Sequence, residues 1–469
     1  MLKQIGASLR VENKSVDFIG ADERYGHPRR LFTIWFSVNL SIVCLTVGMI
    51  GVQAGLGLVW ALVALLLGSA VGTIFMAAHS AQGPHLGIPQ MIQSRAQFGV
   101  IGAAIPLISV VLTYTLYMSA DAVIVRGILA SLLGVGEPTA IICFGAITLV
   151  VAFVGYELIH RLGAALSVTS GVLFGVTAVL LYLDPGHRIA GNPTADVWHM
   201  DKLIFVSTLT QAAAWSLTFG PYVADYSRYL PIKSTTSETF WFTAIGNFLG
   251  TSITMSLGAV IAAYFPSIAE DPGLGVSSLF GRADIPIRFL IVFGVMQGNV
   301  LNLYSAYMSS VTVLTAFNMR QSRVMLAKLG IMIAVTAVAS WIAVAARENF
   351  DSNFGDMLSV MGYLLVPWSA VNLADYYFVR AGRYNIQDLF HRNGIYAAFN
   401  PVGIGVYFVT VATEIPFAQL SQFSGVVAQY LGADISWVVG LLIPMIFYTL
   451  FERQRLSRHP SLLFTGIAE

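Results

Sequence analysis

Residues 211–230 read QAAAWSLTFGPYVADYSRYL and place a Gly-Pro pair inside an apolar run that is otherwise helical. Proline removes a backbone hydrogen-bond donor and clashes with the preceding turn, so Gly220-Pro221 predicts an interrupted helix. In lipid an interrupted backbone must be covered by protein or face a cavity, because no water is present to pair its polar groups. The stretch therefore predicts a membrane protein with a discontinuous helix.

The composition of the whole chain agrees with this prediction. Charged residues make up 10% of the 469 residues and the mean hydropathy is +0.74, whereas a soluble domain carries about 25% charged residues. The apolar runs have about the 20 residues that a helix needs to cross the hydrocarbon core. We expect an all-α polytopic membrane protein with twelve transmembrane helices, at 31–53, 56–79, 100–131, 138–157, 162–183, 203–223, 239–265, 286–315, 326–346, 355–379, 396–413 and 434–451.

The positive charges predict the orientation of these helices. With the N-terminus in the cytoplasm, 19 of the 25 Lys and Arg residues fall on cytoplasmic segments, as the positive-inside rule requires. We therefore expect a multi-pass protein of the plasma (inner) membrane with both termini in the cytoplasm. The first thirty residues show no cleavable signal. The lipid bilayer is a predicted partner, and the net charge of +1 does not indicate nucleic acid.

Two further segments bear on the architecture. Residues 82–99 are too polar to span and predict a short cytoplasmic helix or a re-entrant segment. In the first span Asn39, Ser41 and Thr46 interrupt the apolar surface, which makes this span a second, weaker candidate for a discontinuous helix. Spans 1 and 6 occupy equivalent places if helices 1–5 and 6–10 form inverted repeats, and paired discontinuous helices mark a transporter's binding site.

The expected organisation follows from these segments. We expect a lead-in at 1–30, a ten-helix core at 31–380 divided into repeats at 31–183 and 203–380, helices 11 and 12 at 381–452, and a cytoplasmic tail at 453–469.

Polar residues inside the spans are the candidate functional residues, because they are costly in lipid. Asp121 lies four residues after Tyr117, so both point along one helix face. It is either a substrate acceptor or proton carrier, or it is paired with Arg126, which lies about 140° away around the helix. Asn299 and Asn302 share a face of span 8 and either bind substrate or join helices.

Aromatic residues precede the predicted interruption of span 6. Trp215 lies too deep for an interfacial belt, and Trp215 and Phe219 would suit a flat heterocycle by stacking. No phosphate-binding loop, dinucleotide fingerprint or catalytic triad pattern is present. The sequence therefore predicts a transporter rather than an enzyme, with no cofactor and no metal centre.

Several motifs resemble one family. RYGHPRRLFTIWFSVNLS, PQMIQSRAQFG, ADYSRY, GNVLNLYS and LADYYFVRAGRY, taken in order over roughly residues 10–390, are similar to the nucleobase–cation symporters, and most to the cytosine/purine permeases. The resemblance implies twelve helices with a five-plus-five inverted repeat (LeuT-like), discontinuous helices 1 and 6, and transport of a nucleobase-like ring coupled to Na⁺ or H⁺.

The resemblance also implies site residues by position. For the substrate these are Phe36 of helix 1, Tyr117 of helix 3, Trp215, Ser216 and Thr218 of helix 6, and Asn299 of helix 8. We add Asp121 and Phe219 from their own chemistry. For the coupling cation the resemblance implies backbone carbonyl groups near Asn39–Ile42, and we add Asp121 and Gln297 as candidates.

Two departures from the family pattern concern the cation. Sodium-coupled relatives carry adjacent Thr or Ser hydroxyls in helix 8, where this chain has Gln297 and Gly298, and a hard cation needs oxygen ligands. Asp121 also replaces a residue that is not acidic in those relatives. Both departures favour proton coupling over a sodium site.

These observations predict a secondary active importer of a purine or cytosine-like base, working as a monomer by alternating access and proton symport. The alternatives are an amino-acid or amine permease of the same fold, or a permease for allantoin, hydantoin or a ring-bearing vitamin. A channel or membrane scaffold is the alternative from another class, and free amino acids would compete for uptake only in an amino-acid permease.

Overall fold

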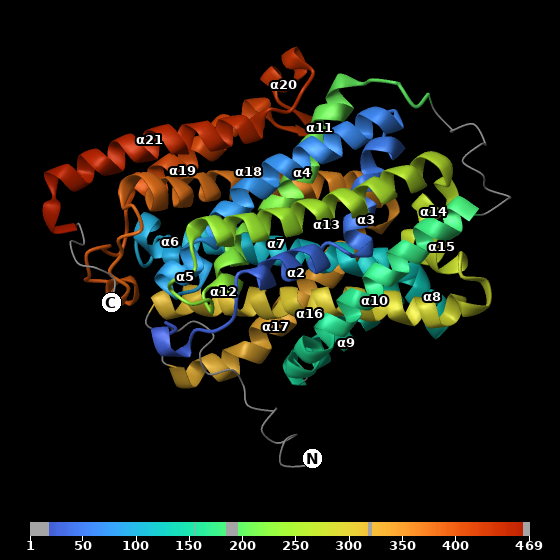
Figure 1. The fold of residues 1–469 in the computed structure, drawn as a ribbon, viewed down its shortest axis with the longest axis horizontal. Helices are drawn as coiled ribbons and strands as arrows, with labels where there is room; N and C mark the ends of the chain where they lie inside the picture. Colours follow the sequence, from blue (N-terminus) through green and yellow to red (C-terminus); the bar gives the residue numbers. More distant parts are fainter. Residues whose placement is uncertain (1–17, 155, 184–195, 318–320, 463–469) are drawn as a thin grey trace, which may run out of the picture.

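The computed structural model describes residues 18–154, 156–183, 196–317 and 321–462. Long helices run side by side along the longest axis of the molecule (Figure 1). The long elements are α2 (Arg29–Val38), α3 (Ile42–Gln53), α4 (Leu58–Ser80), α7 (Ala104–Ile124), α9 (Glu137–Val154), α10 (Tyr156–Leu183), α11 (Lys202–Leu217), α13 (Thr236–Tyr264), α16 (Asp284–Ala316), α17 (Gln321–Ala346), α18 (Phe350–Ala374), α19 (Pro401–Glu414) and α21 (Ser436–Arg458).

Short elements join these helices at their two ends. They are η1 (Ala21–Glu23), α5 (Gln82–Leu86), α6 (Gln90–Phe98), α8 (Arg126–Leu133), η2 (Gly220–Tyr222), α12 (Val223–Ser227), α14 (Pro266–Glu270), α15 (Pro272–Ser278), η3 (Gly281–Ala283), η4 (Arg347–Asn349), the π-helical turn η5 (Asp375–Val379), η6 (Gln387–Phe390), η7 (Ile415–Phe417), α20 (Val426–Leu431) and η8 (Pro460–Leu462). A two-stranded antiparallel hairpin, β1 (Gln419–Leu420) and β2 (Phe423–Ser424), pairs Gln419 with Ser424. We call the two ends of the bundle the α6 end and the α14 end.

The membrane-spanning helices agree with the predicted positions. Within the described ranges, eight helices are long and apolar enough to cross a membrane, and ten are if each of two bent pairs is one span. Two shorter apolar helices, Thr169–Leu181 and Pro401–Phe417, lie where the sequence predicts spans 5 and 11. The polar segment at 82–99 forms α5 and α6 instead of a span, as predicted.

Both predicted interruptions are present, but their order of sharpness is reversed. The helix 1 pair, α2 and α3, is bent by 59°, whereas residues 202–227 are interrupted after Leu217 and still count as one 26-residue span. Asn39 bonds back to the Trp35 carbonyl and Ser41 caps α3 by accepting from Cys44 N, so side chains replace the helical backbone bonds. Pro221 lies in the first turn of η2, where its missing N–H is tolerated.

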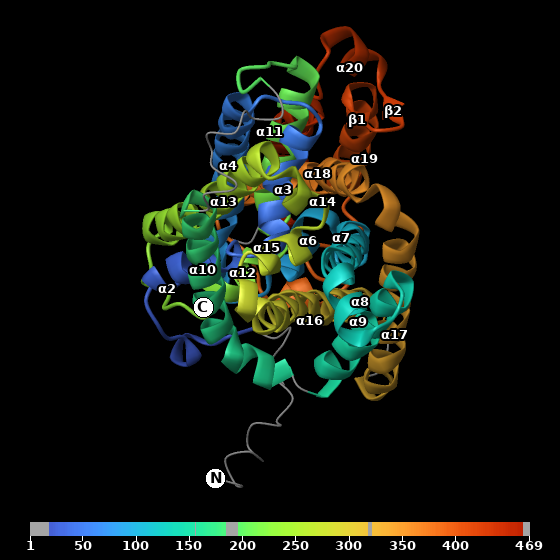
Figure 2. The same ribbon diagram turned by 90° about the vertical axis from the view of Figure 1, so that its right-hand side faces the viewer.

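The helices pack in groups. One group contains α2, α3, α4, α11 and α13, a second contains α7, α9, α16 and α17, and a third contains α18, α19 and α21. Figure 2 shows α8, α9 and α17 together, away from α4 and α11. Gly48 and Gly258 bring α3 and α13 close, because a Cβ at either position would lie within about 2 Å of a carbonyl oxygen of the facing helix, and small residues permit such approaches in membranes.

Candidate functional site

The two interrupted helices meet at their breaks. The indole Nε1 of Trp215, at the end of α11, donates to Oδ1 of Asn39 at 2.8 Å. Asn39 is the C-cap residue that directly follows α2. The contact places the break of helix 1 beside the last turn of α11, and the candidate site lies at this junction.

Three aromatic rings contact one another in sequence at the junction. Tyr117 of α7 and Trp215 lie edge to face with ring centroids 5.6 Å apart, and Trp215 and Phe219 form a second edge-to-face pair at 5.6 Å. Such pairs place flat ring faces in different directions. The structure therefore brings together Tyr117, Trp215 and Phe219, three of the residues that the sequence predicts for the substrate site.

The Thr218 hydroxyl makes two hydrogen bonds that fix the ring of Tyr117. Thr218 Oγ1 donates to the Trp215 carbonyl oxygen at 2.7 Å and lies 2.7 Å from the Tyr117 hydroxyl. Because a threonine hydroxyl has one proton, Tyr117 must be the donor in the second bond. Thr218 thus connects α7 with the backbone just before the helix 6 interruption.

Asp121 lies one turn beyond Tyr117 on α7 and is 5% exposed. Its carboxylate faces the Asn302 side chain of α16, and Oδ2 lies 4.0 Å from where a Cβ of Gly298 would be. The acid therefore sits over the position at which this chain lacks a hydroxyl side chain. Arg126 instead pairs with Glu137 at 3.3 Å, so the predicted alternative of an Asp121–Arg126 pair does not describe this structure.

Asn299 lies three residues before Asn302 on α16, so both amides share one helix face. It is 1% exposed, and its Oδ1 has no hydrogen-bond partner among the residues that the structure describes. A buried unpaired amide oxygen is uncommon and calls for an explanation. The Oδ1 of Asn299 is therefore an acceptor that is available to a ligand.

The remaining predicted residues occupy different surroundings. Ser216 accepts a hydrogen bond from Asn247 of α13 at 2.9 Å. Phe36 stacks on Phe32, with centroids 5.7 Å apart. Ile42 is buried at the start of α3, and Gln297 is half-buried on α16.

An aromatic cluster that the sequence reasoning missed closes the site toward the α6 end. Trp35, the neighbour of Phe36, contacts Phe219, Tyr222 and Tyr226. Tyr114, one turn before Met118 on α7, lies 5.8 Å from Tyr222. The signal in the sequence was the tyrosine spacing of PYVADYSRY, which repeats every three or four residues.

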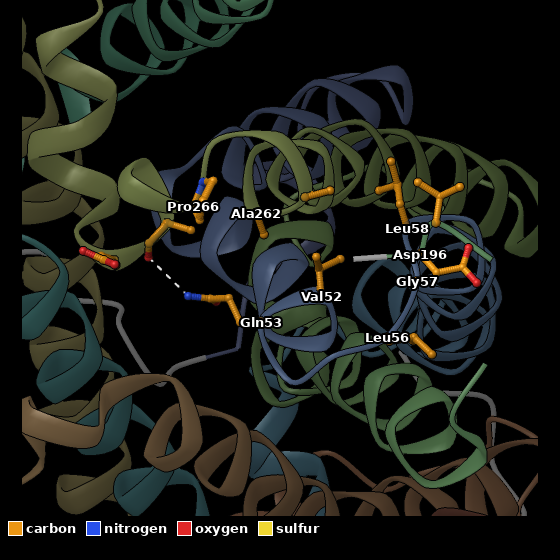
Figure 3. A pocket seen from close by; sticks show the side chains of 12 residues that line it. Val52, Gln53, Leu56, Gly57, Leu58, Asp196, Ala262 and Pro266 are labelled. Atoms are coloured by element: carbon orange, nitrogen blue, oxygen red, sulfur yellow. Dashed lines mark hydrogen bonds between the residues drawn. The ribbon is translucent and has the colours of Figure 1, made fainter. Parts of the chain in front are cut away.

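A cavity of about 250 Å³ opens at the α14 end, between the ends of α3, α4 and α13 (Figure 3). Val52, Gln53 and Ala262 are among its lining residues, and the Gln53 amide donates to the Ala269 carbonyl at 3.3 Å. Since α3 has 12 residues and a helix rises 1.5 Å per residue, the cavity is about 18 Å from the helix 1 break. It is separate from the junction described above.

Known proteins of one permease family match this chain over most of its length. The model of the family "Permease for cytosine/purines, uracil, thiamine, allantoin" matches residues 18–440. The Bacillus subtilis protein named "Putative purine-cytosine permease YxlA" is 36% identical over 451 residues, covering 96% of this chain and 98% of YxlA. The purine-cytosine permease FCY2 of Saccharomyces cerevisiae is 26% identical over 415 residues, covering 81% of this chain and 74% of FCY2.

The fold is also that of a solved transporter. Mhp1, a nucleobase-cation-symport-1 family transporter, matches in a closed conformation with bromovinylhydantoin bound at a TM-score of 0.74 and 18% identity, covering 97% of this chain and 98% of Mhp1. These findings confirm the family resemblance, the polytopic all-helical fold with broken helices, and a transporter rather than an enzyme. The chain belongs to the nucleobase–cation symporter family of permeases for cytosine/purines, uracil, thiamine and allantoin.

Proposed function

We propose that the protein imports a purine or cytosine-like base together with a proton, which binds at Asp121. The observation that carries the proposal is that a buried acid and a buried amide oxygen lie on two helices that pack together, and that the amide oxygen has no partner in the described part of the chain. Asp121 lies on α7 one turn from Tyr117, whose ring contacts Trp215, and Asn299 lies on α16, which packs against α7.

The substrate class follows from the chemistry of the walls. Ring faces at Tyr117, Trp215 and Phe219 suit a planar heterocycle, and stacking contributes about 0.5–1.5 kcal/mol per aromatic pair. Asn299 and Asp121 can read the donor and acceptor groups on the ring edge. Relatives named as purine-cytosine permeases favour a base over hydantoin or allantoin, which are named for less similar relatives.

The coupling ion follows from Asp121 and Gly298. Among the ion pairs that the structure describes, none involves Asp121, and an ionised buried carboxylate without a cation is costly in lipid. Protonation removes that cost, and Gly298 contributes no side-chain oxygen for sodium. We therefore propose that Asp121 is protonated when the substrate is bound.

The orientation rests on charge. With both termini in the cytoplasm of a plasma (inner) membrane, the Lys and Arg distribution follows the positive-inside rule. The α6 end then faces the cytoplasm, and the aromatic cluster of Trp35, Tyr114 and Tyr222 closes the inward path.

The proposal is tested by thermal unfolding of the purified protein with a panel of adenine, hypoxanthine, cytosine, uracil, allantoin, hydantoin and free amino acids. A ligand that binds the folded state stabilises it according to its affinity. We expect a purine or cytosine to raise the midpoint equally with NaCl and with choline chloride. Stabilisation by amino acids alone, or only in Na⁺, would contradict the proposal.

A further inference from the structure

Asn247 is an amide in the middle of the apolar helix α13, and it is 0% exposed. Its Oδ1 accepts from Asn39 Nδ2 at 2.9 Å. Its Nδ2 donates to Thr73 Oγ1 at 2.7 Å and to Ser216 Oγ at 2.9 Å. Both protons of the amide nitrogen are therefore used, and the orientation of the side chain is fixed.

The partners of Asn247 come from three other elements. Asn39 ends α2 at the break of helix 1, Ser216 lies in the last turn of α11 before the interruption of helix 6, and Thr73 lies on α4. One side chain on α13 thus joins four helices, including both discontinuous ones. We call Asn247, Asn39, Thr73, Ser216 and Trp215 the Asn247 network.

The network reaches the candidate site through Asn39. The two protons of Asn39 Nδ2 go to Asn247 Oδ1 at 2.9 Å and to the Trp35 carbonyl at 2.7 Å. Its Oδ1 must then point the other way, where it accepts from Trp215 Nε1 at 2.8 Å. If Asn247 did not accept from Asn39, the Asn39 amide nitrogen would keep only its bond to the Trp35 carbonyl, and the amide that holds the indole N–H would be less firmly oriented.

We propose that Asn247 is a positioning residue. It fixes the indole of Trp215 through Asn39, and it keeps the interrupted segments of helices 1 and 6 in a fixed position relative to each other. The inference rests on the proposed function, in which Trp215 contacts the substrate. Asn247 itself does not touch the substrate. Its role is to prevent the Asn39 amide from turning and the Trp215 ring from rotating.

The α13 helix offers a matched control. Thr243 lies one turn before Asn247, is equally buried, and its hydroxyl has no partner within the described part of the chain. Thr243→Val therefore changes a buried polar residue of the same helix without removing a bond. Thr73→Val is a milder change in the network itself, because Ser216 still holds the Asn247 amide in place.

The first test measures equilibrium binding of radiolabelled adenine and cytosine to the full-length protein. We expect Asn247→Leu to raise the Kd about tenfold, Thr73→Val to raise it less, and Thr243→Val to leave it within about twofold. In a Trp215→Phe background, which lacks the indole N–H, Asn247→Leu should add little. Equal effects in both backgrounds, or no effect in either, would overturn the proposal.

The second test needs no ligand and separates the two proposals. Backbone amide exchange by mass spectrometry reports local opening. Asn247→Leu and Thr73→Val should speed exchange in residues 37–44 and 215–222 together, whereas Thr243→Val should not. If neither base binds the wild-type protein, the proposed function fails, and unchanged exchange at both breaks would independently refute the network's role.

Discussion

The two walls of the candidate site differ in how completely their polar groups are paired. On the wall formed by α2, α4, α11 and α13, the Asn247 and Asn39 amides use every proton they carry. On the wall formed by α7 and α16, Asp121 faces Asn302, while Asn299 Oδ1 has no partner in the described ranges.

The difference separates positioning from binding. A buried polar group without a partner costs about 1–3 kcal/mol. A fully paired network therefore stabilises one arrangement of helices. An acceptor without a partner instead favours the ligand-bound state, in which the ligand pairs with it. Changes to the α7–α16 wall should therefore alter binding and coupling directly. Changes to the other wall should act through geometry.

Asp121→Asn should have the largest effect. The amide resembles the protonated acid in shape but cannot release a proton, so we expect concentrative uptake to fall to the level of empty vesicles. Exchange of labelled for unlabelled base should continue, because it requires no net proton movement. Undiminished accumulation in this variant would contradict the assignment of the proton to Asp121.

Asn299→Leu should weaken binding of the base by about ten- to hundredfold. The variant replaces the unpaired acceptor by an apolar side chain of similar size, and a buried ligand group without its partner costs about 1–3 kcal/mol. Equilibrium binding of adenine and cytosine measures the loss. The control is Ser310→Ala, whose hydroxyl bonds only the Ala306 carbonyl of its own helix in the structure; it should bind as the wild type does.

Tyr117→Phe should weaken binding by about fivefold. It keeps the ring but removes the 2.7 Å bond to Thr218, and one such bond contributes about 1 kcal/mol. Because Tyr117 and Thr218 share this bond, the double variant Tyr117→Phe/Thr218→Val should lose less affinity than the sum of the two single losses. Strict additivity would show that the two residues act separately.

Glu270→Gln should have the smallest effect. Glu270 lines the cavity at the α14 end and is exposed, away from both walls of the site. We expect binding and uptake within about twofold of the wild type at any pH between 6 and 8, since an exposed charge contributes little. A large loss would move the binding site toward this cavity.

Local sequence features predicted much of the fold and one wall of the site. Gly220-Pro221 marked the interruption of helix 6, and the four-residue spacing of Tyr117 and Asp121 placed both on one face. Asp121 was detectable because an acid inside an apolar run is rare in lipid. These predictions depend only on the geometry of one helix.

The other wall could not be predicted in this way, because its contacts join distant parts of the chain. Asn39 and Asn247 are 208 residues apart, and their sequence signal was only a buried amide in each of two spans. Whether Trp35 or Phe36 faces the site depends on how α2 is rotated about its axis, since adjacent residues of a helix differ in direction by 100°. The 96° bend between α8 and α9 brings Glu137 to Arg126.

Proton movement during uptake reports directly on whether Asp121 carries a proton with the base. Proteoliposomes that enclose a pH-sensitive dye are given adenine or cytosine in sodium-free buffer, for the wild type and for Asp121→Asn. We predict that the base acidifies the interior of wild-type vesicles and leaves the variant's interior unchanged. Equal acidification in both, or base uptake that requires Na⁺ and moves no protons, would contradict proton symport through Asp121.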